Sequence, residues 1–341
     1  MAERVRISDV ARAAGVHSGT VSRALNPATA HLVNATTAKK VRKAAKDLGY
    51  IPDVLARGLR TNRSMTVGVL VPDLTNPIFP PLVRGVQAVL EQHGYTALVA
   101  NTDGSADTER KVFETLIGRR VDGFVVATGL ADPFIAEEAA KRGVPIVLAN
   151  RGSTSLSLPE VVGNDGQGIV AAIDHLVELG HTDVLYLSGP ESFITSVVRT
   201  EAFSRRAAQV DGLRTEIVYA DALSVTAGEA FMEQVLGRDP RPTAVVAGND
   251  LLALGVYRAL HAHGLRCPED VSVIGFNDMP FAEDFAPPLT TVRAPHQAMG
   301  LEAARLLVEA IGADGPQPAV SLSLPVSLVV RESTAPPPRK R

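Results

Sequence analysis

The chain has 341 residues, of which 45% are hydrophobic and 21% are charged, a composition typical of a globular protein with more than one domain. The single cysteine, Cys267, excludes an internal disulfide and a cysteine-rich zinc site. The net charge of −3 is unevenly divided, because residues 1–63 hold 12 of the 34 Lys/Arg but only 4 of the 37 Asp/Glu. A basic segment is often just a solvated surface, but it also suits a protein that binds a polyanion with one end.

The first motif, residues 7–27, has the spacing of a helix-turn-helix. Small apolar residues recur one turn apart in two segments: Val10, Ala11 and Ala14, then Val21 and Leu25. We expect Ser8 to cap the first helix and Gly15 to end it. The second helix presents small or hydrogen-bonding residues, as a recognition helix in the major groove must: Ser18, Gly19, Thr20, Ser22 and Arg23. The alternative is a small helical hairpin whose outer face is merely solvated.

A third helix is expected from Ala35 to Leu48, opened by Thr36 and Thr37 and carrying basic residues on its outer faces. The segment after it, residues 54–64, is short and basic, with two leucines one turn apart. It is either a linker with a helical turn or a hinge helix laid on DNA, with a leucine available as a wedge between base steps.

From Met65 onward, short apolar strands alternate with amphipathic helices. Strands are predicted at 66–71, 96–100, 122–127, 145–149, 161–163, 184–188, 216–219, 244–247 and 271–275. Helices are predicted from near Phe79, Asp107 and Asp132, and over 166–179, 196–210, 227–236 and 250–263. This alternation predicts an α/β protein with parallel sheets, and so many strands favour two doubly wound lobes with a cleft between them. The fold class is therefore an all-α helix-turn-helix head and hinge followed by a two-lobed α/β core.

Polar side chains follow the strands, at the sheet edges where ligands bind in such folds. They are Asp73, Asn76, Thr128, Asn150, Arg151, Asn164, Asp165, Ser192, Arg199, Asn249, Asp250, Asn277 and Asp278, with Phe79 as an aromatic. Amides, carboxylates, arginines and an aromatic face suit a polyhydroxylated or small polar solute. Asn and Asp after strands are also ordinary turn and capping residues, so each position alone stays open.

Over nearly its full length the chain resembles the lactose-repressor/galactose-repressor (LacI-type) family of transcriptional regulators. The matching stretches are ISDVARAAGVHSGTVSRALNP, GYIPDVLARGLRT, RVDGFVVA, DHLVELGH, VAGNDLLALGVYRAL, CPEDVSVIGFNDMP, PPLTTVRAP and LVVREST. The resemblance implies a periplasmic-binding-protein-like core and a homodimeric repressor. Such a repressor binds a pseudo-palindromic operator, and its DNA affinity is controlled by a small effector in the interlobe cleft. The Pro-rich, basic tail after LVVREST carries no heptad of leucines, which favours a dimer over a tetramer.

The resemblance also implies domain boundaries and site residues. The domains are a DNA-binding head (1–50), a hinge (51–64), a core (65–334) and a disordered tail (335–341). Within the core, lobe one takes about 65–163 and 294–322, and lobe two about 164–293 and 323–334. Bases are read by Ser18, Gly19 and Arg23, the DNA backbone is contacted by Ser8, Thr20 and Ser22, and the minor groove by Ala56, Leu59 and Arg60. The effector is contacted by Asp73, Asn76, Ile78, Phe79, Thr128, Arg151, Arg199, Asn249 and Asn277.

Three departures from the family pattern bear on specificity. Gly19 has no side chain where a base-reading one is common, so Arg23 and DNA shape carry more of the readout. Asn277 replaces an expected aspartate, and the stretch ADALSVTAG lacks an aromatic that sugar-binding relatives place there. A sugar effector is therefore one expectation, and a phosphorylated or carboxylated ligand held by Arg199 and Arg151 is the other.

Catalytic and cofactor motifs are missing: there is no GxGxxG, GxxxxGK[ST] or GxSxG, and the histidines show no metal-ligand spacing. We therefore expect no enzyme activity, no cofactor and no metal. The alternative is a solute-binding protein without a DNA role, which would need an export signal and no basic head. The N-terminus has charges where a signal peptide has an apolar core, and no apolar run approaches membrane-spanning length. We thus expect a cytoplasmic, nucleoid-associated bacterial protein without a membrane partner.

Overall fold

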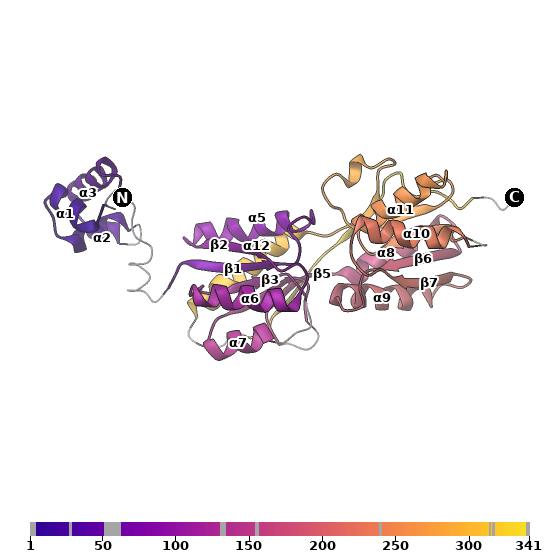
Figure 1. Cartoon of the computed structure of the whole chain (residues 1–341), viewed down its shortest axis with the longest axis horizontal. Helices are drawn as coiled ribbons and strands as arrows, with labels where there is room; N and C mark the ends of the chain where they lie inside the picture. The colour runs from indigo at the N-terminus through magenta and orange to yellow at the C-terminus, as the bar shows by residue number, and fades with distance from the viewer. Residues whose placement is uncertain are drawn as a thin grey trace. The chain divides into compact units, whose positions relative to one another are not determined.

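The computed structural model describes residues 5–26, 29–50, 63–129, 134–153, 157–238, 241–313, 315 and 318–338. The chain divides into two compact units, Met1–Ser64 and Met65–Arg341 (Figure 1).

The first unit is a small helical domain. Its elements are α1 (Ile7–Ala14), α2 (Ser18–Leu25), the 3-10 turn η1 (Ala30–Leu32) and α3 (Ala35–Asp47). The helices enclose one small apolar core, formed by Val10, Ala11, Val21, Ala24, Ala38, Val41 and Ala45. Gly15 ends α1 in the left-handed conformation (φ 67°), which a glycine adopts without steric cost. The two short helices and the tight turn predicted for residues 7–27 are present.

Two capping predictions in this unit are wrong. Helix α1 is capped at Arg6 rather than Ser8, because the carboxylate of Asp9 accepts the Arg6 backbone N–H at 2.9 Å. Ser8 lies inside the first turn and is exposed. Helix α3 begins at Ala35 as predicted, but its cap is Asn34, whose side chain accepts the amide of Thr36 at 2.9 Å, rather than one of the two threonines.

The second unit holds two sheets of six strands each. The first sheet, in lobe one, has the order β11-β5-β4-β3-β1-β2, and all its strands are parallel. Its strands are β1 (Thr66–Val71), β2 (Thr96–Asn101), β3 (Phe124–Val126), β4 (Ile146–Asn150), β5 (Glu160–Gly163) and β11 (Ser321–Leu324). Its helices are α5 (Phe79–Gln92), α6 (Ala106–Gly118), α7 (Phe134–Arg142) and α12 (His296–Gly312). Helices α5 and α12 cover one face of the sheet, and α6 and α7 the other (Figure 1).

The second sheet, in lobe two, has the order β12-β10-β9-β8-β6-β7. Its strands are β6 (Asp183–Ser188), β7 (Arg214–Tyr219), β8 (Ala244–Ala247), β9 (Ser272–Asn277), β10 (Thr290–Arg293) and β12 (Ser327–Val329). Its helices are α8 (Asp165–Glu178), α9 (Ile194–Ala207), α10 (Val225–Leu236), α11 (Asp250–Ala262) and the turn η2 (Ala282–Asp284). Strand β12 pairs antiparallel with β10 at the edge, and the other pairs are parallel. The predicted fold class, a helical head followed along the chain by two doubly wound lobes, is confirmed.

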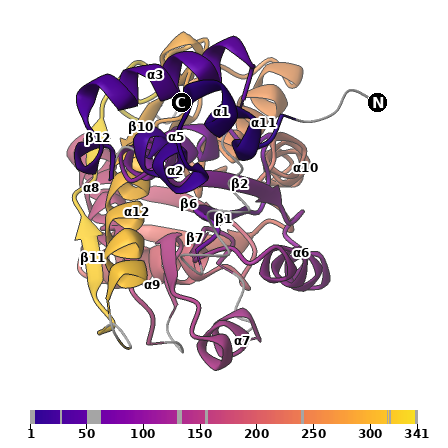
Figure 2. The ribbon, with the colours of Figure 1, turned by 90° about the vertical axis from the view of Figure 1, so that its left-hand side faces the viewer.

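The chain passes between the lobes three times. The passages follow β5, β10 and β11, since each of these strands belongs to a different sheet from the strand after it. Helix α12 returns to lobe one and packs along α5 (Figure 2). The contact is backbone on backbone, because a Cβ added to Gly300 would lie 2.0 Å from the carbonyl oxygen of Leu82. This packing fixes the start of α12, and with it His296, against lobe one.

Among the described residues, no helix combines the length and apolarity that crossing a bilayer requires.

Candidate functional site

A cluster of charged and aromatic side chains lies where the strands of both lobes end. Arg151 and Thr128 follow β4 and β3 of lobe one, while Arg199 on α9 and Phe276 on β9 belong to lobe two. The doubly wound topology brings these positions together, because the carboxyl ends of parallel strands share one edge of a sheet.

Arg199 is fully engaged within lobe two. Its Nε and Nη2 lie 2.8 and 2.7 Å from Oδ2 of Asp165, and its Nη1 donates to the carbonyl of Gly248 at 2.6 Å. The guanidinium lies 3.6 Å from the ring centre of Phe276. Burial raises the pKa of Asp165, and the charge of Arg199 opposes this. The two buried groups therefore form an ion pair whose charges cancel.

Arg151 joins the two lobes. Its Nη1 donates to the backbone carbonyl of Thr128 at 2.6 Å, and its guanidinium lies 4.3 Å from the ring centre of Phe193, which precedes α9 in lobe two. The stem of Arg151 fills the space over Gly129, where an added Cβ would be only 2.4 Å from Cδ. The residue is 4% exposed. Burial, followed by the charge of Arg199, lowers the pKa of Arg151 to about 10.

His296, the first residue of α12, is a further buried member of the cluster. Its Nε2 has no hydrogen-bond partner. Burial and, after it, the charge of Arg199 lower the pKa of His296 to about 4, against the backbone of Ala294, which acts to raise it. Neither His296 nor the aromatic residues Phe193 and Phe276 is predicted from the sequence. A lone histidine after Pro295 and two apolar aromatics carry no pattern that distinguishes a site from a core.

Most of the effector residues implied by the resemblance are buried: Asn76, Ile78, Phe79, Thr128, Arg151, Arg199, Asn249 and Asn277. Some of them have a local structural role. Asn249 caps α11, its side chain accepting the amide of Leu252 at 2.8 Å. Phe79 is packed into the core of lobe one. Asp73 is exposed and accepts the backbone N–H of Thr75 at 2.8 Å, as a turn residue does.

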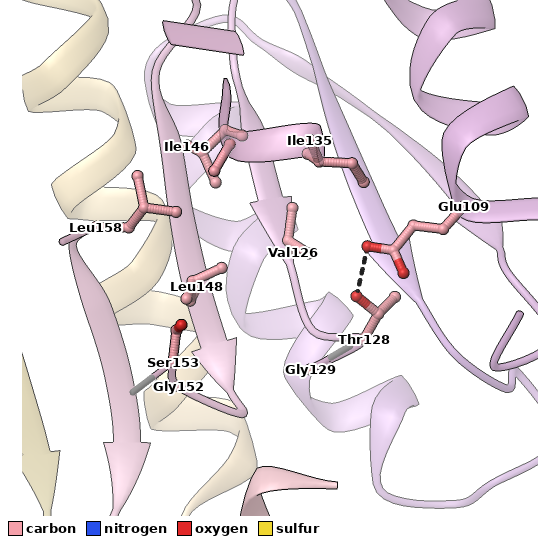
Figure 3. A pocket seen from close by; sticks show the side chains of 11 residues that line it. Glu109, Val126, Thr128, Gly129, Ile135, Ile146, Leu148, Gly152, Ser153 and Leu158 are labelled. Atoms are coloured by element: carbon pink, nitrogen blue, oxygen red, sulfur yellow. Dashed lines mark hydrogen bonds between the residues drawn. The ribbon is translucent and has the colours of Figure 1, made fainter. Parts of the chain in front are cut away.

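Thr128 also lines a separate pocket in lobe one (Figure 3). Its hydroxyl donates to the buried carboxylate of Glu109 at 2.9 Å, and the surrounding side chains from β3, β4 and α7 are mostly apolar. Neither Arg151 nor Arg199 lines this pocket. Across the described ranges, no group of three or more His, Cys, Asp or Glu side chains is arranged to hold a metal ion.

The helical unit presents the residues expected to face DNA. On α2, Arg23 is exposed, and Ser18, Gly19, Thr20 and Ser22 are partly exposed. The Nε of Arg23 lies 3.3 Å from the carbonyl oxygen of Gly19, one turn back. Helix α3 adds exposed basic side chains: Lys39, Lys40, Arg42, Lys43 and Lys46. The predicted hinge residues Ala56, Leu59 and Arg60 lie outside the described residues.

Comparisons with known proteins agree with this division of the chain. Residues 6–53 match the description "Bacterial regulatory proteins, lacI family", and residues 173–334 match a periplasmic binding protein-like domain. The chain is 38% identical to the HTH-type transcriptional regulator MalR of Streptomyces coelicolor, over 98% of both chains.

Solved structures show the same likeness. The lac repressor dimer bound to operator and the anti-inducer ONPF superposes with a TM-score of 0.87 at 28% identity, covering 98% of this chain and 100% of that one. A complex of the transcriptional regulator CelR with cellobiose superposes with a TM-score of 0.73 at 32% identity, covering 97% of this chain and 100% of that one. These relatives are regulators rather than enzymes. The chain belongs to the lacI family of bacterial regulatory proteins, and it is a helix-turn-helix transcriptional regulator with a periplasmic-binding-protein-like domain.

Proposed function

We propose that this regulator is a repressor that binds a pseudo-palindromic operator as a homodimer, in the bacterial cytoplasm at the nucleoid. Helix α2 enters the major groove, where Ser18, Gly19 and Arg23 face the bases and Thr20, Ser22 and Ser8 the backbone. Residues 51–64 act as the hinge, with Ala56, Leu59 and Arg60 in the minor groove and Leu59 as the wedge. The observation that carries the proposal is the likeness, over nearly the whole chain, to a repressor dimer on its operator.

We further propose that a small polar effector, a sugar or sugar derivative, binds between the lobes and changes the affinity for DNA. The cluster around Arg151 and Arg199 supports this placement, as does the cellobiose bound to the relative CelR. The effector acts through the difference in its affinity for the two states of the regulator, for which about 1–3 kcal/mol of coupling is typical.

For the first test, an operator is selected from random DNA duplexes, and the affinity of the protein for it is measured by fluorescence anisotropy. Arg23→Ala should cost about 1–3 kcal/mol at one base pair of each half-site and relax discrimination there. The matched control is Arg12→Ala, which removes the same charge from the exposed side of α1. Unchanged discrimination among single-base operator variants would contradict the assignment of α2. An operator with one half-site that binds as tightly as one with two would contradict the dimer.

A further inference from the structure

The two buried arginines of the cluster differ in charge balance. Arg199 is paired with Asp165, so this pair adds no net charge. Arg151 has for partners a backbone carbonyl and an aromatic face, and no described carboxylate lies within ion-pairing distance of it. A buried cation without a counter-ion is costly, and structures keep one mainly where an anion comes to it.

Arg151 is also held in one position, as a binding residue should be. Its stem rests on Gly129, its Nη1 is fixed by Thr128, and its guanidinium faces Phe193 of the other lobe. A planar guanidinium fixed in this way keeps other N–H donors for a phosphate or carboxylate, which it binds with good geometry.

His296 adds a complementary requirement. Its Nε2 is buried without a hydrogen-bond partner. Where Nε2 carries the lone pair of the neutral ring, it needs an O–H or N–H donor. Arg199 acts electrostatically on both His296 and Arg151, which places all three in one electrostatic neighbourhood.

We propose that the effector is a hydroxylated anion, such as a sugar phosphate or a sugar acid. Its anionic group is the counter-ion of Arg151, and one of its hydroxyls donates to Nε2 of His296. This inference rests on the proposed function, namely that an effector binds between the lobes, and it names the chemical class of that effector. A neutral sugar would satisfy His296 and leave Arg151 without a counter-ion.

The test uses matched ligand sets on the purified full chain by isothermal titration calorimetry: hexoses, their phosphates and the corresponding hexonic acids. We expect a charged member to bind about thirtyfold or more tightly than its neutral parent, the factor associated with a buried charge pair. Arg151→Gln should abolish this preference, and Arg151→Lys should restore part of it. Arg142→Gln, which removes a charge from the exposed end of α7, should leave the preference intact. Comparing the hexose phosphates with the hexonic acids shows whether the site prefers a phosphate or a carboxylate.

A second measurement needs no identified ligand. Because the charge of Arg151 is uncompensated, millimolar inorganic phosphate should raise the Tm of the wild type more than that of Arg151→Met. A neutral sugar that binds more tightly than all its charged derivatives would overturn the inference, and so would an equal response of the wild type and Arg151→Met to phosphate. If a charged ligand binds through Arg151 but leaves operator affinity unchanged, the proposed control of DNA binding fails, while the class of ligand assigned to the site stands.

Discussion

Replacing His296 by Phe tests whether this buried ring is neutral in the folded protein. Burial and the charge of Arg199 lower the pKa of His296 from 6.5 to about 4. Below pH 6.5 the unfolded chain therefore binds a proton that the folded chain does not, so the wild type loses stability as the pH falls. One pKa unit corresponds to about 1.4 kcal/mol, so at pH 5 this loss is about 2 kcal/mol relative to pH 8. Phe has a similar shape and does not titrate, so the variant lacks this loss.

The assay is urea unfolding of both proteins at pH 8 and pH 5, followed by circular dichroism and extrapolated linearly to water. From pH 8 to pH 5, the unfolding free energy of the wild type should fall by about 2 kcal/mol relative to that of His296→Phe. Using the difference cancels the contributions that the two proteins share, including that of Asp165, whose carboxylate pairs with Arg199. His261→Gln, at an exposed position on α11, controls for the loss of a histidine as such. A difference that is the same at both pH values would refute the burial argument.

Substitutions at two further positions test other parts of the chain. Gly15→Ala places a side chain on a residue with left-handed backbone and open space around it, so it should lower the stability of the helical unit by about 1 kcal/mol. Amide hydrogen exchange in α1 and α2 should then be about fivefold faster, and Gly15→Asn should cost less stability. Burial raises the pKa of Asp250 to about 7, against hydrogen bonds from the Met279 amide and the Thr291 hydroxyl. The folded protein thus holds a proton that the unfolded chain releases, so the wild type should lose roughly 2–3 kcal/mol relative to Asp250→Asn between pH 5 and pH 8, measured by urea unfolding.

The sequence predicts the alternation of strands and helices well, because burial on both faces of a parallel strand produces a continuous apolar run. It predicts helix starts less well. At α1 the carboxylate of Asp9, the third residue of the helix, accepts the backbone N–H of Arg6, while the expected cap, Ser8, is exposed. Strand β11 alternates Ser with Leu over four residues, and strand β12 has only three residues, so neither carries a long apolar run and neither is predicted from the sequence.

The sequence predicts that Asp165, Arg151 and Arg199 lie near one another, but it does not predict how they pair. The rule that ligands bind at the carboxyl ends of strands selects Asp165, Arg151 and Arg199 correctly as residues of one neighbourhood. It does not show that Asp165 neutralises Arg199 and leaves Arg151 alone, because pairing depends on where α8 and α9 pack. His296 reaches the same neighbourhood through a passage between lobes and the close contact of α12 with α5. These contacts depend on tertiary packing, and no local sequence pattern predicts them.

The pairing of Asp165 with Arg199 can itself be tested against a nearby pair on the same two helices. Asp165→Asn keeps the shape, leaves a buried guanidinium unpaired and removes a favourable charge from the first turn of α8, so it should cost about 3–5 kcal/mol. The matched control is Asp174→Asn, which breaks the half-exposed pair of Asp174 and Arg206 at 2.6 Å and should cost less than about 1 kcal/mol. Thermal unfolding compares the two variants. Inorganic phosphate should stabilise Asp165→Asn more than the wild type, since the variant holds two buried cations without counter-ions. Equal losses in the two variants would mean that burial does not set the strength of these pairs, and the argument from the uncompensated charge of Arg151 would fall with it.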